Sequence, residues 1–182
     1  MFLDAEEFAF VRPLEAAWTT IRDECLALGP ADFEPWVQRE MYGEGWEVYG
    51  LHAFGRRVER GLAACPRTAA LVEAVPGVTT AGFSRLAAGA HIQPHVGWVH
   101  TVYRLHLGLV VPAGCTLRVG DETRNWADGE CLIFDDTVEH EAHNRSPADR
   151  IVLLLDFLRP GVDPSQVDVA PPEVQAMLDR EA

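Results

Sequence analysis

The spacing of apolar residues predicts helices in the first part of the chain. Between residues 13 and 28, apolar side chains recur every three or four positions, which is typical of a helix with one buried face. Gly29 and Pro30 follow directly and end this pattern. The expected elements of this part are helices at 13–28, 56–64 and 69–74 and a short strand at 48–51.

The pattern changes after Gly77. Short runs rich in Val, Leu, Ile and Phe alternate with turn-forming residues, which is typical of a β-barrel or β-sandwich. The expected strands are 78–86, 102–111, 116–119, 130–134 and 150–158. We therefore predict a mainly β protein with flanking helices, as one domain over 1–182 with a mainly helical part at 1–75, a β core at 76–160, and a tail at 161–182 that ends in a helix at 172–180.

Composition supports a globular protein and excludes several classes of partner. The 182 residues are 48% hydrophobic and 24% charged, close to the average of globular domains. Fifteen Lys and Arg against 28 Asp and Glu give a net charge of −13, so we expect neither nucleic acid nor a membrane as a partner. The chain contains no lysine, which excludes Schiff-base chemistry and a phosphate-binding P-loop.

Cysteine usage and the absence of a leader pattern predict a cytoplasmic protein. The first residues are acidic and carry no signal-peptide pattern, and no apolar stretch is long enough to span a membrane. We expect reduced thiols, and we expect those in apolar strands to pack as small hydrophobic groups rather than bind metal. The four cysteines, none in CxxC spacing, are Cys25, Cys65, Cys115 and Cys131.

Histidines cluster in the predicted β core. Four of the seven lie between residues 91 and 106, and two more stand at 140 and 143. Imidazole is the commonest metal ligand in proteins, although a single histidine on a strand is usually structural. In segment 104–109, strand alternation puts Arg104 and His106 on one face and leucines on the other. A cationic face opposite a leucine face indicates that the polar side chains line a cavity.

A third basic residue is expected at the same cavity. Segment 150–156 is apolar on both faces after Arg150, so this strand is predicted to be buried with Arg150 at the mouth of the core. Together with Arg104 and His106 it could bind a dianion, because guanidinium groups make two-point contacts with carboxylates.

An acidic turn precedes the second histidine group. Asp135 and Asp136 follow a predicted strand, and His140 comes four residues after Asp136. The segment is either an exposed acidic loop or part of a metal site, because opposed strands of a small barrel could bring His95 and His140 together. Two imidazoles with an acid nearby suit Fe(II).

These pieces, taken in order, resemble the aspartyl/asparaginyl β-hydroxylase family of Fe(II)/2-oxoglutarate dioxygenases. The matching segments are PHVG at 94–97, RLHLGLVVP at 104–112, LRVG at 117–120, WADGECLIFDDTVEHEAHN at 126–144 and RIVLLLDFLRP at 150–160. The upstream pieces GW at 45–46, CPRT at 65–68 and PGVTTAGFS at 76–84 extend the resemblance to about residues 35–160. Each piece alone is weak, but the ordered set is specific.

The resemblance implies a fold and a cofactor set. The fold would be a double-stranded β-helix, a jelly roll of two sheets with helices outside, as in cupins. The enzyme would bind Fe(II), use 2-oxoglutarate as cosubstrate and consume O2. The residues that the resemblance assigns to iron are His95 and His140, and those that it assigns to 2-oxoglutarate are Arg104 and His106 at one end and Arg150 and Ser84 at the other.

Two positions depart from wider patterns. Gly97 stands where most dioxygenases of the superfamily carry a third, carboxylate ligand, although the β-hydroxylase family itself lacks that acid. We expect Asp136 to hold an iron-bound water instead. His143 stands where an aromatic residue is expected, and we interpret it as variation at the surface or pocket wall rather than a third ligand.

The resemblance implies hydroxylation of an unactivated C–H bond, most simply Cβ of an aspartyl or asparaginyl residue in an amino-acid or peptide substrate. Arg85, Arg118 or Arg145 could meet a substrate carboxylate, and Trp98 lies either near the substrate or in the core. A halogenase is an alternative, because Gly97 leaves room for a halide. A cupin-like protein that binds metal or dicarboxylate without turnover is another.

Overall fold

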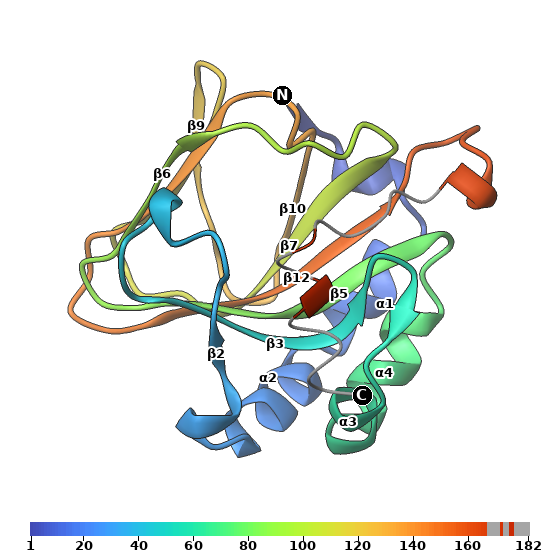
Figure 1. Cartoon of the computed structure of the whole chain (residues 1–182), viewed down its shortest axis with the longest axis horizontal. Coiled ribbons are helices and arrows are strands. Elements are labelled where there is room, and N and C mark those ends of the chain that lie inside the picture. Colours follow the sequence, from blue (N-terminus) through green and yellow to red (C-terminus); the bar gives the residue numbers. More distant parts are fainter. Residues whose placement is uncertain (167–171, 173–174, 177–182) are drawn as a thin grey trace.

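The computed structural model describes residues 1–166, 172, 175 and 176, and its strands form two facing sheets (Figure 1). The strands are β1 (Phe2–Leu3), β2 (Glu34–Pro35), β3 (Trp46–Ala53), β4 (Arg56–Arg57), β5 (Val78–Leu86), β6 (His91–His95), β7 (Val102–Val110), β8 (Cys115–Val119), β9 (Glu122–Asn125), β10 (Cys131–Phe134), β11 (His140–Asn144) and β12 (Arg150–Leu158). The α-helices are α1 (Val11–Ala16), α2 (Trp18–Ala27), α3 (Glu59–Ala64) and α4 (Pro66–Glu73). The 3₁₀ helices are η1 (Ala5–Glu7), η2 (Pro30–Asp32), η3 (Arg39–Met41) and η4 (Pro164–Gln166).

Sheet topology confirms the predicted jelly-roll class. The larger sheet has the order β1-β10-β7-β12-β5-β3-β2, with β4 paired to β3, and the smaller sheet has the order β6-β11-β8-β9. Every ladder between neighbouring strands is antiparallel. Strands far apart in sequence, such as β5 and β12, are therefore neighbours in space, and each sheet contributes one wall of the space between them.

Alternation along the central strands separates two cores. In β7, Leu105 and Leu107 are fully buried against the helices, whereas Arg104 and His106 point into the space between the sheets. The predicted division of this strand into a leucine face and a polar face is thus confirmed. In β12 the two faces are both buried, as predicted, and Arg150 begins the strand.

The helices cover the outer face of the larger sheet. Figure 1 shows α1 to α4 gathered on one side of the molecule. Ile21 and Cys25 of α2 and Val72 of α4 belong to the same apolar core as the leucines of β7. The helix predicted at 13–28 is two helices that meet at Ala17, and the apolar spacing runs on across that junction, so the pattern could not locate the break.

A second core fills the space between the sheets and forms part of the wall of the pocket that holds the polar side chains. Trp46, Leu86, Leu117 and Phe134 are among its buried members. Burial at about 25 cal/mol per Å² of apolar surface makes both cores major sources of stability. The walls of the polar pocket are consequently rigid, close-packed strands rather than loops.

The predicted boundary between helical and β parts needs correction. β3 begins at Trp46 and pairs with β5 along its length, so the β core starts about 30 residues before the predicted position of 76. Gly50 and a half-polar pattern hid the full extent of this strand, of which only 48–51 was predicted. Residues 56–57 form strand β4, and the helix predicted at 56–64 begins at Glu59.

Three strands of the smaller sheet, β6, β9 and β11, were not predicted. All are short and rich in polar residues, so they lack an apolar strand pattern. The helix predicted at 172–180 falls largely outside the described residues. The four cysteines are free and buried. Within the described part of the chain, no helix has the length and apolar character that a bilayer crossing would need.

Candidate active site

His95 and His140 lie side by side at the open end of the pocket between the sheets. They face each other across β6 and β11 with ring centroids 4.1 Å apart, which places the predicted ligand pair together. Ile92 pairs with Ala142 and His95 pairs with His140, so β6 advances by three residues where β11 advances by two. This register shift, a bulge, turns His95 inward, whereas strict alternation would put it on the same outer face as His91.

Among the described residues, neither ring has a hydrogen-bond partner at its Nε2 nitrogen. Nδ1 of His95 donates to the carbonyl of Gln93 at 2.7 Å, and Nδ1 of His140 donates to the carbonyl of Val138 at 2.9 Å. A backbone carbonyl that fixes the Nδ1 proton leaves the Nε2 lone pair available to a metal. Burial lowers the pKa of both rings, that of His140 to about 3 with His95 as the second cause, so both are neutral ligands near neutral pH.

Arg150 is a buried cation that lacks a carboxylate partner among the described residues. Its side chain is 1% exposed, and its Nε and Nη1 make no hydrogen bond within that part of the chain. The guanidinium lies over the ring of Trp126 at 4.8 Å, a favourable contact but not a neutralising one. Burial lowers its pKa to about 10, which leaves it charged at neutral pH. A charge buried at this cost implies an anion that binds beside it.

His106 supplies a second unused donor in the same pocket. Its Nδ1 accepts a hydrogen bond from Nε1 of Trp126 at 3.3 Å, so the ring proton is on Nε2, which is buried and has no partner among the described residues. Burial, with Arg150 as the next cause, holds the pKa of His106 well below its ordinary value. The neutral ring therefore presents an N–H group to the pocket, and Trp126 positions both it and Arg150.

Arg104 is held by two carboxylates of the protein. Its Nε and Nη2 donate to the two oxygens of Asp156 at 2.7 and 2.8 Å, and its Nη1 lies 3.3 Å from Oδ2 of Asp136. Two of the five guanidinium N–H groups thus donate to Asp156, and the ion pair with Asp136 commits a third side of the guanidinium to the protein. The assignment of Arg104 to 2-oxoglutarate therefore stays a prediction, and the structure adds a role in positioning Asp136.

Ser84 and Asp136 complete the predicted set. Ser84 lines the pocket from β5, and its Oγ accepts a hydrogen bond from Nε1 of Trp46 at 3.0 Å, which leaves the hydroxyl proton to be donated. Asp136 is 2% exposed, and its Oδ1 has no partner among the described residues. Burial raises the pKa of Asp136 and the neighbouring Arg104 opposes that shift.

A broad groove leads away from the pocket. It encloses about 1250 Å³, its solvent-filled mouth included, against about 360 Å³ for the pocket, and His95 and Arg104 border both. Val96 and Trp98 line it and are 57% and 41% exposed, so Trp98 lies at the groove rather than in the core. None of the three arginines considered for a substrate carboxylate lines the groove, and they contact instead Glu47 (Arg85), Glu139 and Glu141 (Arg118) and Thr116 (Arg145).

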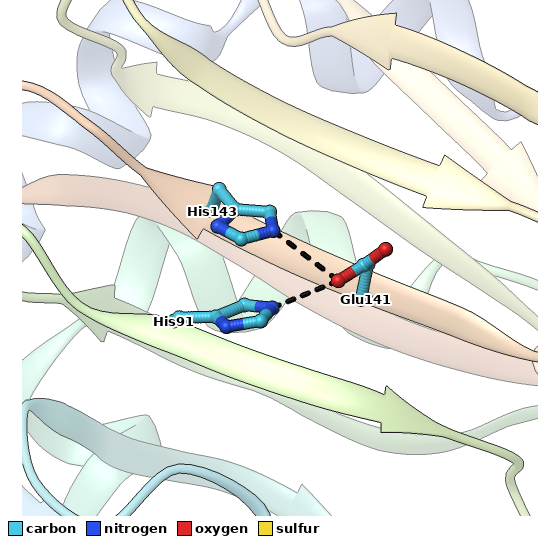
Figure 2. A group of neighbouring side chains, drawn as sticks. All are labelled: His91, Glu141 and His143. Carbon is cyan, nitrogen blue, oxygen red and sulfur yellow. Dashed lines mark hydrogen bonds and ion pairs between the residues drawn. The ribbon is translucent and has the colours of Figure 1, made fainter.

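The sequence interpretation did not include a histidine cluster on the opposite face of the smaller sheet (Figure 2). His91 and His143 both contact the carboxylate of Glu141, and their ligand atoms lie close enough for one metal ion. His143 points away from His140, because successive side chains of β11 alternate between faces. It is therefore a surface residue and belongs neither to the pocket wall nor to the His95–His140 pair.

The chain matches known sequences along most of its length. A sequence model of the aspartyl/asparaginyl beta-hydroxylases matches residues 15–160. The chain belongs to the aspartyl/asparaginyl β-hydroxylase family. Family membership, together with the jelly roll, confirms the resemblance stated from the motifs.

Curated relatives in this hydroxylase family carry several names. The chain is 42% identical over 124 residues to the ornithine lipid ester-linked acyl 2-hydroxylase of Rhizobium tropici, which covers 66% of this chain and 44% of that protein. It is 34% identical over 165 residues to the human aspartyl/asparaginyl beta-hydroxylase, and this match covers 86% of this chain and 22% of that protein. It is 46% identical over 85 residues to the mouse aspartate beta-hydroxylase domain-containing protein 1, and this match covers 45% of this chain and 24% of that protein. The chain thus spans less than half the length of each.

Gly97 of this β-hydroxylase family member packs directly against Asp136. A Cβ atom at position 97 would lie 2.3 Å from Oδ2 of Asp136, and the amide of Gly97 donates to the carbonyl of Asp136 at 2.7 Å. The space that a third protein ligand would take is therefore filled by the Asp136 carboxylate. The same carboxylate occupies the room that the halogenase hypothesis needs for a halide, and its negative charge would repel one.

We expect Gly97→Ala to destabilise the fold by about 1–3 kcal/mol, because the new methyl group overlaps Asp136 and the strand end must shift. Thermal unfolding monitored by circular dichroism measures the effect. Gly50→Ala is the matched control, since a Cβ there would meet only Val58 at 3.6 Å, an ordinary contact. Equal melting temperatures for the two variants would contradict the packing described here.

Proposed function

We propose that the protein is an Fe(II)- and 2-oxoglutarate-dependent hydroxylase whose iron is held by His95 and His140. The observation that carries this proposal is Arg150, a charged side chain 1% exposed and without a carboxylate partner in the described chain, in the pocket that the two imidazoles border. A metal-chelating dicarboxylate needs both a cation for its carboxylate and a metal held by the protein. The buried arginine and the two neutral imidazoles would provide these in one pocket.

The described pocket residues fit 2-oxoglutarate as a set of donors. Arg150 offers Nε and Nη1, His106 offers Nε2, and Ser84 offers its hydroxyl proton. All are buried, so each hydrogen bond to a carboxylate oxygen would form in a site with little competing water. One carboxylate would be bound by Arg150 and Ser84, and the other end would lie toward His106 and the metal.

Each remaining residue has a defined task in the proposed reaction. The carbonyls of Gln93 and Val138 hold His95 and His140 in the tautomer that binds metal. Asp136, fixed by Arg104, would accept a hydrogen bond from a water beside the metal through its free Oδ1. When bound, iron and 2-oxoglutarate supply the oxidising chemistry, in which O2 gives one oxygen atom to the cosubstrate, which becomes succinate and CO2, and the other to a C–H bond.

The experiment that tests this function is the release of succinate from 2-oxoglutarate. When the protein is incubated in air with Fe(II) and 2-oxoglutarate, it should form succinate slowly even without a prime substrate. Omission of iron or of O2 should abolish succinate formation. A cupin-like binding protein would bind the dicarboxylate without this turnover. Absence of succinate with every component present, and with a panel of amino-acid, peptide and acyl substrates added, would refute the proposal.

The charge and the apolar character of the groove lining indicate which class of substrate it would accept. An aspartyl or asparaginyl Cβ remains the prediction from the resemblance, yet an ionised aspartate needs a cation, and the arginine that lines the groove, Arg104, is already paired with Asp136 and Asp156. Much of the remaining lining is apolar, with Val96 and Trp98 exposed at its edge. We therefore propose a second substrate class, a neutral or cationic molecule with a hydrocarbon chain.

Trp98→Ser is expected to raise KM for an acyl substrate about tenfold, because loss of a large apolar contact costs on the order of 1–2 kcal/mol. Succinate release stimulated by N-acyl and ester-linked acyl amino acids of increasing chain length measures this effect. Leu26→Ser is the matched control, since Leu26 is also exposed, at 56%, but lies on α2 away from the groove. Stimulation by aspartyl peptides alone, unaffected by Trp98→Ser, would contradict the acyl class.

A further inference from the structure

We propose that His91, Glu141 and His143 form a second divalent-metal site, of the kind that Zn²⁺ occupies, on the outer face of the smaller sheet. The site is separate from the His95–His140 pair and does not rest on the proposed function. His91 belongs to β6, and Glu141 and His143 belong to β11, so the three side chains converge from two adjacent strands (Figure 2).

The three ligand atoms are already close together. Nε2 of His91 lies 2.8 Å and Nε2 of His143 lies 3.2 Å from the same oxygen, Oε2 of Glu141, and all three atoms lie within 4.8 Å of one another. In tetrahedral zinc sites with metal–ligand distances of about 2.0–2.1 Å, neighbouring ligand atoms are about 3.3 Å apart. The present spacing brackets that value, so a metal requires only small movements.

One movement is defined by the rings themselves. His91 and His143 are stacked with centroids 3.6 Å apart and planes 14° from parallel. For both Nε2 lone pairs to meet at one ion, the rings must open away from parallel. Both side chains are partly exposed, at 28% and 23%, so they have room to rotate.

Neighbouring polar groups complete the environment of a metal site. Nε of Arg118 binds Oε1 of Glu141 at 2.5 Å, which fixes the carboxylate and leaves Oε2 for an ion. The side-chain amide of Gln93 lies 2.9 Å from Nδ1 of His91. When a metal takes the Nε2 position, the His91 proton moves to Nδ1, and a rotated Gln93 amide can accept it through its oxygen.

The location indicates what the metal would do. His91 and His143 are paired directly across β6 and β11, as are His95 and His140 farther along the same strands. An ion on the outer face would clamp the two strands that carry the inner pair. The outer cluster borders neither the groove nor the pocket described above, and the arginine beside it, Arg118, is paired with Glu139 and Glu141. A stabilising role therefore suits it better than binding of a dicarboxylate.

The test is zinc stoichiometry in a set of four proteins, the 182-residue chain and three variants of it. After removal of metal, each is dialysed against Zn²⁺, and bound zinc is measured by elemental analysis and by calorimetric titration. The wild type should bind two ions per chain, His143→Phe one, the His95→Ala/His140→Ala protein one, and the triple variant none. The phenyl ring preserves the stacking on His91 while it removes the ligand nitrogen, so a purely structural role of His143 would not change the zinc count.

The zinc affinity of His143→Phe and a control variant, His100→Phe, test the same site further. His143→Phe should weaken the outer site by more than ~100-fold, because even groups that only orient a ligand contribute ~10–100-fold. His100→Phe replaces an exposed histidine outside the cluster and should keep both ions. Unchanged zinc binding in His143→Phe, or no zinc in the His95→Ala/His140→Ala protein, would overturn the proposal without affecting the iron site.

Discussion

Arg150→Met is expected to weaken the binding of 2-oxoglutarate by more than ~100-fold while it stabilises the ligand-free protein. The guanidinium is buried and unpaired within the described chain, so the ligand-free fold bears its desolvation cost. Methionine has a similar volume and no charge. Loss of one partner of a buried charge pair costs about 3–5 kcal/mol, which sets the loss of affinity.

Two measurements check this pair of effects. Calorimetric titration with 2-oxoglutarate under anaerobic conditions gives the affinity, and thermal unfolding of the ligand-free protein should show a melting temperature higher by about 2–4 °C per kcal/mol gained. Arg145→Met is the control, since the Arg145 side chain is exposed, donates to the hydroxyl of Thr116 and does not line the pocket. Full affinity in Arg150→Met would show that the cosubstrate binds elsewhere, and a lower melting temperature would show that the charge is already compensated.

His95→Ala and His140→Ala are each expected to abolish succinate formation, by more than ~1000-fold, with the fold retained. The pair provides the two imidazole ligands proposed for iron, and neither ring can replace the other because they stand on opposite strands. His140 is buried next to Phe134, so its removal leaves a cavity that costs a few kcal/mol at most. Circular dichroism establishes the fold, and chromatography of the products establishes turnover.

His100→Ala serves as the control for these variants, because His100 belongs to the same histidine-rich segment but not to the pocket. Its turnover should stay within about twofold of the wild type. Near-normal succinate formation by either His95→Ala or His140→Ala would show that the ligand assignment is wrong.

The central strands were predictable because their chemistry repeats with the period of a strand. Leucines at every second position of 104–109 predicted the buried face, and Arg104 and His106 predicted the face toward the pocket. Arg150 could be placed at the edge of the core because the residues after it are apolar on both faces. The local sequence pattern was sufficient to predict the orientation of these side chains, because in a regular strand the position of a residue determines the face on which its side chain lies.

The smaller sheet was not predictable in the same way. Strict alternation puts His91, Gln93 and His95 on one face, and only the bulge in β6 sends His95 inward while His91 stays outside. A bulge is a property of pairing with β11, and β11 itself carries no apolar pattern. The sequence therefore indicated a histidine cluster but could not divide it into an inner pair and an outer group.

Partners from distant segments also escaped prediction. Trp126 positions both His106 and Arg150, and Asp156 binds Arg104 through two hydrogen bonds. An indole could equally have been core, and an aspartate at the end of an apolar strand could have been exposed. Only the pairing of β7 with β12 brings Asp156 opposite Arg104 and gives it this role.

The most direct test of the central claim is a crystal structure of the protein soaked with Mn²⁺ and an inert analogue of 2-oxoglutarate. Anomalous scattering locates the manganese independently of the protein density. We predict manganese bound to Nε2 of both His95 and His140, with one carboxylate of the analogue on Arg150. Manganese confined to the outer face at His91 and His143, or an analogue bound away from Arg150, would contradict the account.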